Sequence, residues 1–402
     1  MDTYGRQVPI YDQWQTSVFV AVAAENGTLD FEQLLARHNG HRIFFTNLIT
    51  LGATWFTDWN TDWELWVNLP LALGNLALLV ALFWRQAPDL LPLALVPFSA
   101  LVFSLYQDIS WTTAFQSQWH IVTLFFLAAL LVLTSQPPGW WAWGGAAWLS
   151  VGATFSFGSG FTAWPILGVV LWLVGYRQPV HYLLWAALGA LNIWLYFQGD
   201  SSQAGLQASA LDDPGLHLRY VLAFFGSPLG YRNLDAAAWI GAVGLGLFAV
   251  HILWLWHHSQ QNWAALAPWL AIGAYVFGLA NSTGLSRVGG RESELYIALS
   301  QRYTQASVFF WAALLALVLL VGRAFWRESR RWQRAVVYGQ VILGVMGALL
   351  YLRTNAWSLQ YQHDLYGTYL GHDYGPREFW DEELCVVDYP LYRDSTCSSR
   401  RS

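Results

Sequence analysis

The sequence predicts an all-α fold, a polytopic transmembrane helical bundle with about ten spans. The chain of 402 residues is 55% hydrophobic and only 11% charged, whereas an ordinary soluble domain is about 25% charged. Apolar runs of the length needed to cross a bilayer recur from residue 63 to residue 352. Many of the 26 tryptophans lie at the ends of these runs, as they do in the aromatic belts of membrane proteins.

The charge of the chain argues against nucleic-acid binding, and its two cysteines allow at most one disulfide. All 20 basic residues are arginine, and the net charge of -5 leaves no basic surface suited to nucleic acid. The two cysteines, Cys385 and Cys397, both lie in the polar C-terminal tail. They either form one disulfide in an oxidising compartment or remain two free thiols, and the sequence leaves both alternatives open.

Ten apolar runs are the predicted spans. They cover residues 63–84, 90–106, 118–134, 140–156, 161–175, 180–197, 237–256, 263–281, 304–322 and 334–352, of which 161–175 is the shortest. A span needs about 20 mostly apolar residues, and fewer where the bilayer is thin. No acidic or basic residue lies near the middle of a clear span, which argues against an ion or proton pathway.

The predicted orientation follows from the arginines in short loops, because cytoplasmic loops are enriched in basic residues. The densest cluster consists of Arg323, Arg327, Arg330, Arg331 and Arg334. Placing this cluster inside puts residues 1–62, 107–117, 198–236, 282–303 and 353–402 outside. The predicted layout is therefore a first extracytoplasmic loop over 1–62, a helical bundle over 63–352 with outer loops 198–236 and 282–303, and an extracytoplasmic polar tail over 353–402.

The stretch 43–57 is apolar enough for a span, but counting it as one would move the arginine cluster outside. We therefore predict an amphipathic helix in the membrane interface, with Arg42, Thr46, Asn47 and Thr50 facing water. Residues 1–40 contain no signal peptide or apolar anchor. We expect a fragment or a misplaced start, with one more helix upstream; the alternative is translocation of a short N-terminal tail without a signal.

The first outer segment contains the main catalytic candidate. Asp12 lies between Tyr11 and Trp14 at the predicted membrane face. Partial desolvation there can raise its basicity, so that the carboxylate takes a proton from an alcohol. The alternative is that Asp12 caps a turn. Farther along, residues 28–38 predict a short helix capped by Thr28 or Asp30.

Arg302 is the main candidate for binding an anion. It lies at the end of the predicted outer loop 282–303, which runs directly into a span, and at that height a guanidinium can pair bidentately with a lipid phosphate. The alternative is ordinary interfacial snorkelling, and Arg287 and Arg291 in the same loop could serve the same purpose. Asn75 and Asn192 lie inside spans and are expected to bond to neighbouring helices. The sequence has no P-loop, GxGxxG, HExxH or CxxC motif, and it supports no metal or other cofactor.

Three short stretches together resemble a known superfamily. They are Tyr11-Asp12-Gln13-Trp14, His38-Asn39-Gly40-His41-Arg42 and Arg302-Tyr303. In this order, around many spans, the pattern resembles the bacterial multi-pass membrane proteins of the GT-C glycosyltransferase superfamily. That group includes the protein mannosyltransferases and aminoarabinose transferases, and the chain most resembles a poorly characterised branch. The resemblance covers most of the chain in architecture but only these stretches in residues.

The resemblance implies transfer of a sugar from a polyprenyl-phosphate donor to a carbohydrate, lipid or protein acceptor at the outer face of the bacterial plasma membrane. Asp12 would be the base, Arg302 and Tyr303 would lie at the lipid phosphate, and His41 and Arg42 would line the cavity mouth. Two departures stand out. Gly40 replaces a glutamate of the branch, which weakens any metal site, and no helix precedes the first loop, which points to a truncated or inactive copy.

Two other functions share the same spans. A transporter or flippase of lipid-linked sugars needs the helices but no base, and a non-catalytic truncated membrane protein needs neither base nor anion site. Replacement of Asp12 by asparagine separates an enzyme, which should lose sugar transfer and keep lipid binding, from a flippase, which should be largely indifferent.

Overall fold

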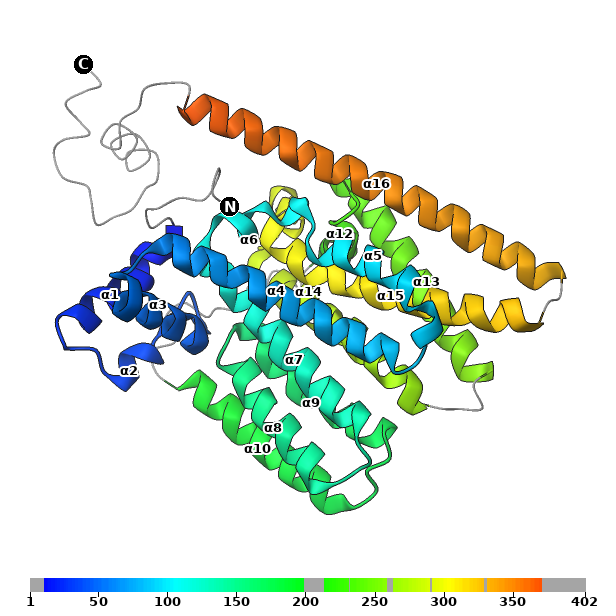
Figure 1. Ribbon diagram of the computed structural model, residues 1–402, viewed down its shortest axis with the longest axis horizontal. Helices are drawn as coiled ribbons and strands as arrows, with labels where there is room; N and C mark the ends of the chain where they lie inside the picture. Colours follow the sequence, from blue (N-terminus) through cyan, green and yellow to red (C-terminus); the bar gives the residue numbers. More distant parts are fainter. Residues whose placement is uncertain are drawn as a thin grey trace. The chain divides into compact units, whose positions relative to one another are not determined.

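The described part of the chain is almost entirely helical, as Figure 1 shows. The computed structural model describes residues 11–198, 213–230, 232–258, 263–289, 291–328 and 331–370. Met1–Asn355 form one compact unit and Ala356–Ser402 a second. Within the described residues the strands are β1 (Arg37–His38) and β2 (His41–Arg42), which pair antiparallel. The all-α prediction is therefore confirmed.

Eight helical stretches in the described part are long and apolar enough to cross a membrane. They are Thr61–Trp84 (α4), Pro88–Thr112 (η2, α5, η3 and α6), Ala114–Ser135 (η4 and α7), Pro179–Phe197 (α10), Leu234–His258 (α13), Trp263–Arg287 (α14), Gln301–Trp326 (in α15, Gln301–Glu328) and Gln333–Tyr361 (in α16, Arg331–Leu370). The pieces of the second and third are η2 (Pro88–Leu90), α5 (Leu91–Val102), η3 (Leu105–Gln107), α6 (Asp108–Thr112), η4 (Ala114–Gln116) and α7 (Ser117–Ser135). Each contains one predicted span.

The other two predicted spans are shorter helices. Residues 140–156 form α8 (Trp140–Thr154, 15 residues), and residues 161–175 form η5 (Gly158–Thr162) followed by α9 (Ala163–Leu173, 11 residues). At 1.5 Å per residue, α8 is only ~22 Å long. These two predicted crossings are consecutive. Whether both cross the membrane or neither does, every later loop therefore stays on the same side of the membrane.

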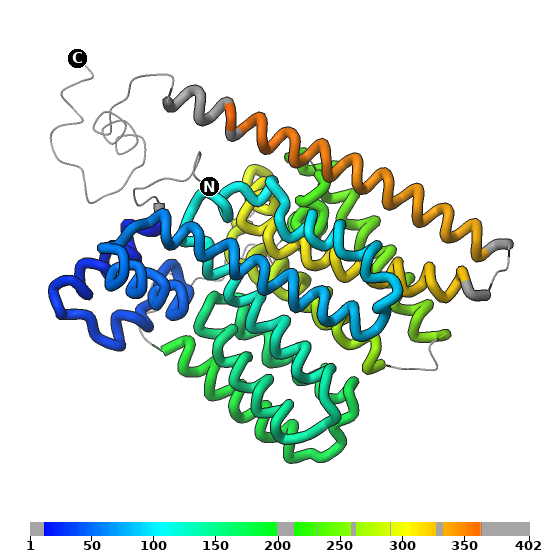
Figure 2. Tube along the Cα trace, viewed as in Figure 1, coloured from blue at the N-terminus to red at the C-terminus, as the bar shows by residue number. Residues whose placement is uncertain are grey.

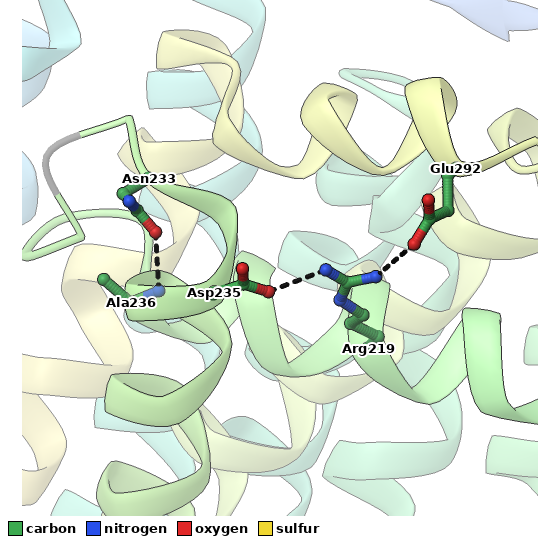
Figure 3. Close-up of polar contacts among 5 residues, drawn as sticks. All are labelled: Arg219, Asn233, Asp235, Ala236 and Glu292. Atoms are coloured by element: carbon green, nitrogen blue, oxygen red, sulfur yellow. Dashed lines mark hydrogen bonds and ion pairs between the residues drawn. The ribbon is translucent and has the colours of Figure 1, made fainter.

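Close helix packing depends on glycine in the described part of α12 and α13. A Cβ on Gly226 of α12 (Pro214–Gly226) would lie 1.9 Å from the Ala237 carbonyl oxygen, and one on Gly241 of α13 would lie 1.9 Å from the Leu222 oxygen. The two backbones therefore touch, as small residues permit in membrane helix pairs. Figure 3 shows the polar contacts above this pair, where Arg219 bridges Asp235 and Glu292.

The ion pairs of Arg219 join three elements. Its guanidinium lies 2.6 Å from Asp235 at the start of α13 and 2.7 Å from Glu292 at the start of η6 (Glu292–Leu299). Asn233, just before α13, accepts the Ala236 amide at 2.9 Å and satisfies an otherwise open N-terminal donor. Both carboxylates are exposed, so we assign this cluster a structural role in aligning loops.

The first segment consists of short elements gathered at one end of α4 (Figure 2). They are η1 (Tyr11–Gln15), α1 (Ser17–Glu25), α2 (Phe31–Leu34), the β1–β2 hairpin and α3 (Phe44–Thr57). Asp30 caps α2 by accepting the Gln33 amide, and the Gln33 side chain accepts the Asp30 amide in return. Of the two predicted caps, Asp30 is the one used, although the helix is shorter than expected.

The orientation predicted for the 43–57 helix is wrong. Thr46, Asn47 and Thr50 are 1–4% exposed and face the protein, whereas Trp55 is 67% and Phe56 81% exposed. Thr46 and Ser117 hydroxyls are 3.2 Å apart, and the Asn47 amide donates to the Leu34 carbonyl at 2.9 Å. The polar face is inside because it finds hydrogen-bond partners on α7 and α2, and the apolar face is left to the surroundings.

The loops fall into two groups by their contacts. At what we call the hairpin end, the β1–β2 hairpin contacts Phe115 and the end of α10 at Tyr196. At the opposite end, Arg85 donates to the Ser135 carbonyl and Arg323 pairs with Asp89. Predicted outer loops thus meet predicted outer loops, and predicted inner loops meet predicted inner ones.

α16 contacts the rest of the first unit through polar groups. Asn355 Oδ1 accepts the Ser104 hydroxyl at 3.1 Å, and the Tyr351 hydroxyl donates to the Ala100 carbonyl. In the second unit, Trp357 and Tyr361 stack at 5.2 Å. Cys385 and Cys397 lie outside the described residues, as does 199–212 of the predicted 198–236 loop.

Candidate functional site

The His38-Asn39-Gly40-His41 stretch is a tight β-hairpin. Asn39 has φ 47° and Gly40 φ 79°, the two positive values of a type I′ turn, for which Asn-Gly is the favoured pair. Arg37 therefore pairs with Arg42, and His38 with His41. Because strand side chains alternate between faces, the two arginines share one face and the two histidines the other. Gly40 is thus required by the turn, which accounts for its place where the resemblance led us to expect glutamate.

The arginine face of the hairpin holds the C-terminal end of α10. Arg42 Nε donates to the Tyr196 carbonyl at 2.9 Å, and its Nη atoms donate to the carbonyls of Leu35 and Gln198. Arg37 donates to the Tyr196 carbonyl at 3.2 Å and lies over the ring of Phe197. These bonds satisfy carbonyls left open at a helix end. Arg42 was expected to line a cavity mouth, but its donors are taken up by the backbone.

The histidine face meets the predicted base. His38 Nε2 lies 3.6 Å from Asp12 Oδ2. The side-chain amide of Asn39 donates to the same His38 nitrogen at 2.8 Å. The His38 ring is buried, edge-on to Phe115 at 5.4 Å, whereas the Asp12 side chain is 33% exposed. A fixed imidazole thus lies against a carboxylate that remains open to a ligand.

The basicity expected for Asp12 is wrong in direction. Its side-chain contact with His38 lowers the pKa of the carboxyl below its ordinary value; the charge of Arg302 and a hydrogen bond from Asn39 act the same way, and partial burial only in part opposes them. Neighbouring donors outweigh desolvation here, because each of them stabilises the charged form. Asp12 is therefore ionised at neutral pH but is a weaker base than an isolated desolvated carboxylate.

Arg302 lies in the first turn of α15, close enough for its charge to act on Asp12. Among the described residues it has no hydrogen bond or ion pair, so its guanidinium is open to an anion. Its neighbour Tyr303 is only 5% exposed and packs between the rings of Trp119 and Phe224, each 5.7 Å away. The structure thus places Arg302 within electrostatic range of Asp12 and directs Tyr303 into the core.

His41 is packed against the turn between α8 and α9. Its ring lies 4.5 Å from that of Phe157, and a Cβ on Gly158 would be 2.3 Å from its Nδ1. Burial, then the charge of Arg287, lowers the pKa of His41 to about 4. The imidazole is therefore neutral at physiological pH. Gly158 is needed to admit this ring, because a side chain there would overlap it.

Aromatic contacts connect the two predicted halves of the site. Phe157, which packs on His41, lies 4.3 Å from Trp119, and Trp119 lies 5.7 Å from Tyr303 beside Arg302. The first segment, the α8–α9 turn and the start of α15 therefore converge. In the described part of the chain no three His, Cys, Asp or Glu side chains gather as a metal site would require.

Two residues of this site, His38 and Asn39, were not assigned a role by the sequence. The available signal was the Asn39-Gly40 pair, which predicts a two-residue hairpin turn and hence the alternation that directs His38 to Asp12.

The asparagines inside the predicted spans bond to neighbouring helices, as predicted. Asn75 donates to the His120 carbonyl, and Asn192 accepts the Trp164 indole, both at 3.0 Å.

Comparison with protein families, with curated proteins and with solved structures finds no match to this chain. The functional assignment therefore depends on the geometry of the hairpin end.

Proposed function

We propose that this protein is an integral membrane glycosyltransferase that moves a sugar from a polyprenyl-phosphate donor to an acceptor hydroxyl. The observation that carries the proposal is one carboxylate, Asp12, held ionised against His38 within the field of an unpaired guanidinium, Arg302. Transfer from a lipid phosphate needs a proton acceptor for the hydroxyl and a cation for the phosphate that leaves.

In this proposal Asp12 takes the proton from the acceptor hydroxyl while Arg302 pairs with the phosphate. The sugar–phosphate bond breaks as the acceptor oxygen attacks from the opposite face, and negative charge develops on the phosphate, where a fixed guanidinium stabilises it. His38 is a positioning residue with a further capacity. Its Nε2 accepts the Asn39 amide when neutral and becomes a donor to Asp12 when protonated, so it can receive the proton that Asp12 takes.

The surroundings of the site suit a donor carried by a lipid. Eight helices have the length and composition of spans, and α3 turns Trp55 and Phe56 outwards beside the hairpin segment. We propose that α8 and α9 complete about ten crossings in a locally thin region, that α1 to α3 lie at the interface, and that the site opens on the outer face of a bacterial plasma membrane. The arginine cluster over residues 323–334, where α15 ends and α16 begins, then lies inside.

The test is sugar transfer in proteoliposomes that contain purified protein and polyprenyl-phosphate hexoses with a labelled sugar. Asp12→Asn should lower transfer at least 100-fold, the lower range for loss of a general base, and should leave binding of polyprenyl phosphate intact. Asp235→Asn, which changes an exposed aspartate paired with Arg219, is the matched control and should keep full activity.

Other outcomes assign the alternative functions. Asp12→Asn protein that transfers sugar like wild type would remove the proposed base. Wild-type protein that moves lipid-linked sugar between leaflets without transferring it would be a flippase. Protein that neither binds polyprenyl phosphate nor moves it would be a non-catalytic membrane protein.

A further inference from the structure

A groove lies on the surface between α9 and α10. It has a volume of about 660 Å³, and its lining is almost wholly apolar. Small residues, among them Gly168, Ala186, Gly189 and Ala190, make room for it, and the rings of Trp164 and Trp172 stand at its sides. The groove lies away from Asp12, along α10, whose C-terminal end is bound by Arg42.

The polar atoms of the groove's rings mostly point away from it. The Trp185 indole donates to the Trp164 carbonyl at 2.8 Å, and the Tyr182 hydroxyl donates to the Tyr176 carbonyl at 2.7 Å. The Trp164 indole donates to Asn192 at 3.0 Å. The groove therefore offers a ligand a hydrocarbon surface with little for a sugar or a peptide to bond to.

The helix surface around the groove is also apolar. α10 is one of the eight helices with the length and composition of a span, and Leu183 on its outer side is 70% exposed. Tyr182 and Ile193 both line the groove, and the eleven residue steps between them correspond to ~17 Å of helix. The hydrocarbon core of a bilayer is about 30 Å thick, so one leaflet supplies chains of about this length.

A cation lies at one end of the groove. Arg177 follows α9; its Nη1 donates to the Trp172 carbonyl at 3.0 Å, and its guanidinium lies 6.0 Å from the Trp172 ring centroid. Arg177 is exposed and has no acidic partner among the described residues. A phosphate at the headgroup level is the anion that this geometry complements, because guanidinium binds phosphate through paired N–H groups.

We infer that the α9–α10 groove and Arg177 form a binding site for one anionic phospholipid. One acyl chain lies along the groove, between the small residues of α9 and α10, and the phosphate pairs with Arg177 beside Trp172. Arg177 belongs to the opposite end of the bundle from Asp12, so this site is separate from the proposed donor site. The inference does not depend on the proposed function.

The test is photo-crosslinking in vesicles of phosphatidylethanolamine and phosphatidylglycerol, with the full chain reconstituted and a diazirine on an acyl chain of the phosphatidylglycerol. Label should concentrate on peptides that contain 165–172 and 182–193. Ala190→Phe fills the groove and should reduce this label at least fivefold. Ala187→Phe makes the same change at the exposed neighbouring position, which does not line the groove, and should leave the label unchanged.

The headgroup is tested separately with Arg177→Gln, which should reduce labelling by the phosphatidylglycerol probe severalfold. It should reduce labelling by a phosphatidylcholine probe much less, because the choline ammonium already balances the charge of that phosphate. Unlabelled phosphatidylglycerol should compete with the wild-type label better than phosphatidylcholine does, which keeps the test decisive if a variant fails to fold. Label spread evenly over all spans, equal label in Ala190→Phe and Ala187→Phe, or cross-links from the groove to a second copy of the chain would overturn the inference.

Discussion

Arginine is used differently at the two ends of the helical bundle. At the opposite end, Arg85 and Arg323 donate to backbone carbonyls, and Arg323 also pairs with Asp89 at 2.8 Å. At the hairpin end, Arg42 has a similar backbone role, but Arg302 is left without a bonded partner among the described residues. Residue type and position at the end of a long apolar helix therefore do not decide an arginine's role, because its role depends on whether open helix carbonyls lie within its reach.

The largest expected effect contrasts Arg302 with Arg323. Arg302→Ala should weaken binding of polyprenyl phosphate by roughly 10- to 100-fold, because a hydrogen bond to a charged group contributes about 1.5–3 kcal/mol. Arg323→Ala removes an arginine that is already paired, and it should leave this affinity unchanged. Binding of radiolabelled polyprenyl phosphate to purified protein in detergent measures both. Equal losses in the two variants would show that only overall charge matters.

The next effect concerns stability, and it separates Arg42 from Arg302. Arg42→Ala should lower the free energy of unfolding by about 2–4 kcal/mol, since the Leu35 and Gln198 carbonyls lose their guanidinium donor and the Tyr196 carbonyl keeps only Arg37. Arg302→Ala should change stability little, because no bond is lost. Thermal unfolding in detergent compares the two. A destabilised Arg302→Ala protein with an unaffected Arg42→Ala protein would reverse the roles assigned here.

Much of the fold follows from the sequence, because apolar runs and arginine-bearing loops are local signals. The eight long helices were predicted from the apolar runs, and Asp30 was one of two caps predicted from helix-start residues. The placement of Arg42 could not be predicted, because its partners, apart from Leu35, lie 153 or more positions away at the end of α10. The orientation of α3 was predicted wrongly because its polar residues bond to α7 and α2, and the period of the helix itself does not show that these partners lie on its polar side.

The candidate site was predicted in outline only. Asp12 and Arg302 were singled out separately, from the aspartate's aromatic neighbours and from the position of the arginine at a span, and they lie within electrostatic reach. The direction of the Asp12 pKa was missed, because it depends on His38 and on the hairpin that carries it. The Asn39-Gly40 pair contained that information, but it was interpreted as part of a motif rather than as a turn.

A smaller effect depends on pH and tests the burial of His41. Its pKa falls from 6.5 to about 4 on folding, so the folded state binds fewer protons than the unfolded state in this window. Burial of neutral His41 therefore has no cost above pH 6.5. It lowers the free energy of unfolding by roughly 2–3 kcal/mol as the pH falls to 4. His41→Gln should flatten this part of the profile. Melting temperatures of both proteins between pH 7 and 4 check it, and parallel profiles would show that His41 is not the group responsible.

The smallest expected effect compares the same substitution at two glycines. Gly40→Ala places a side chain at φ 79° and should cost about 1 kcal/mol, because only glycine takes up this conformation freely. Gly144→Ala in α8 meets no atom within 4 Å and should be neutral or stabilise by up to about 1 kcal/mol. Melting temperatures should therefore move in opposite directions. Because the Gly40 turn directs His38 towards Asp12, Gly40→Ala should also reduce sugar transfer by more than its stability loss explains, whereas Gly144→Ala should leave transfer unchanged.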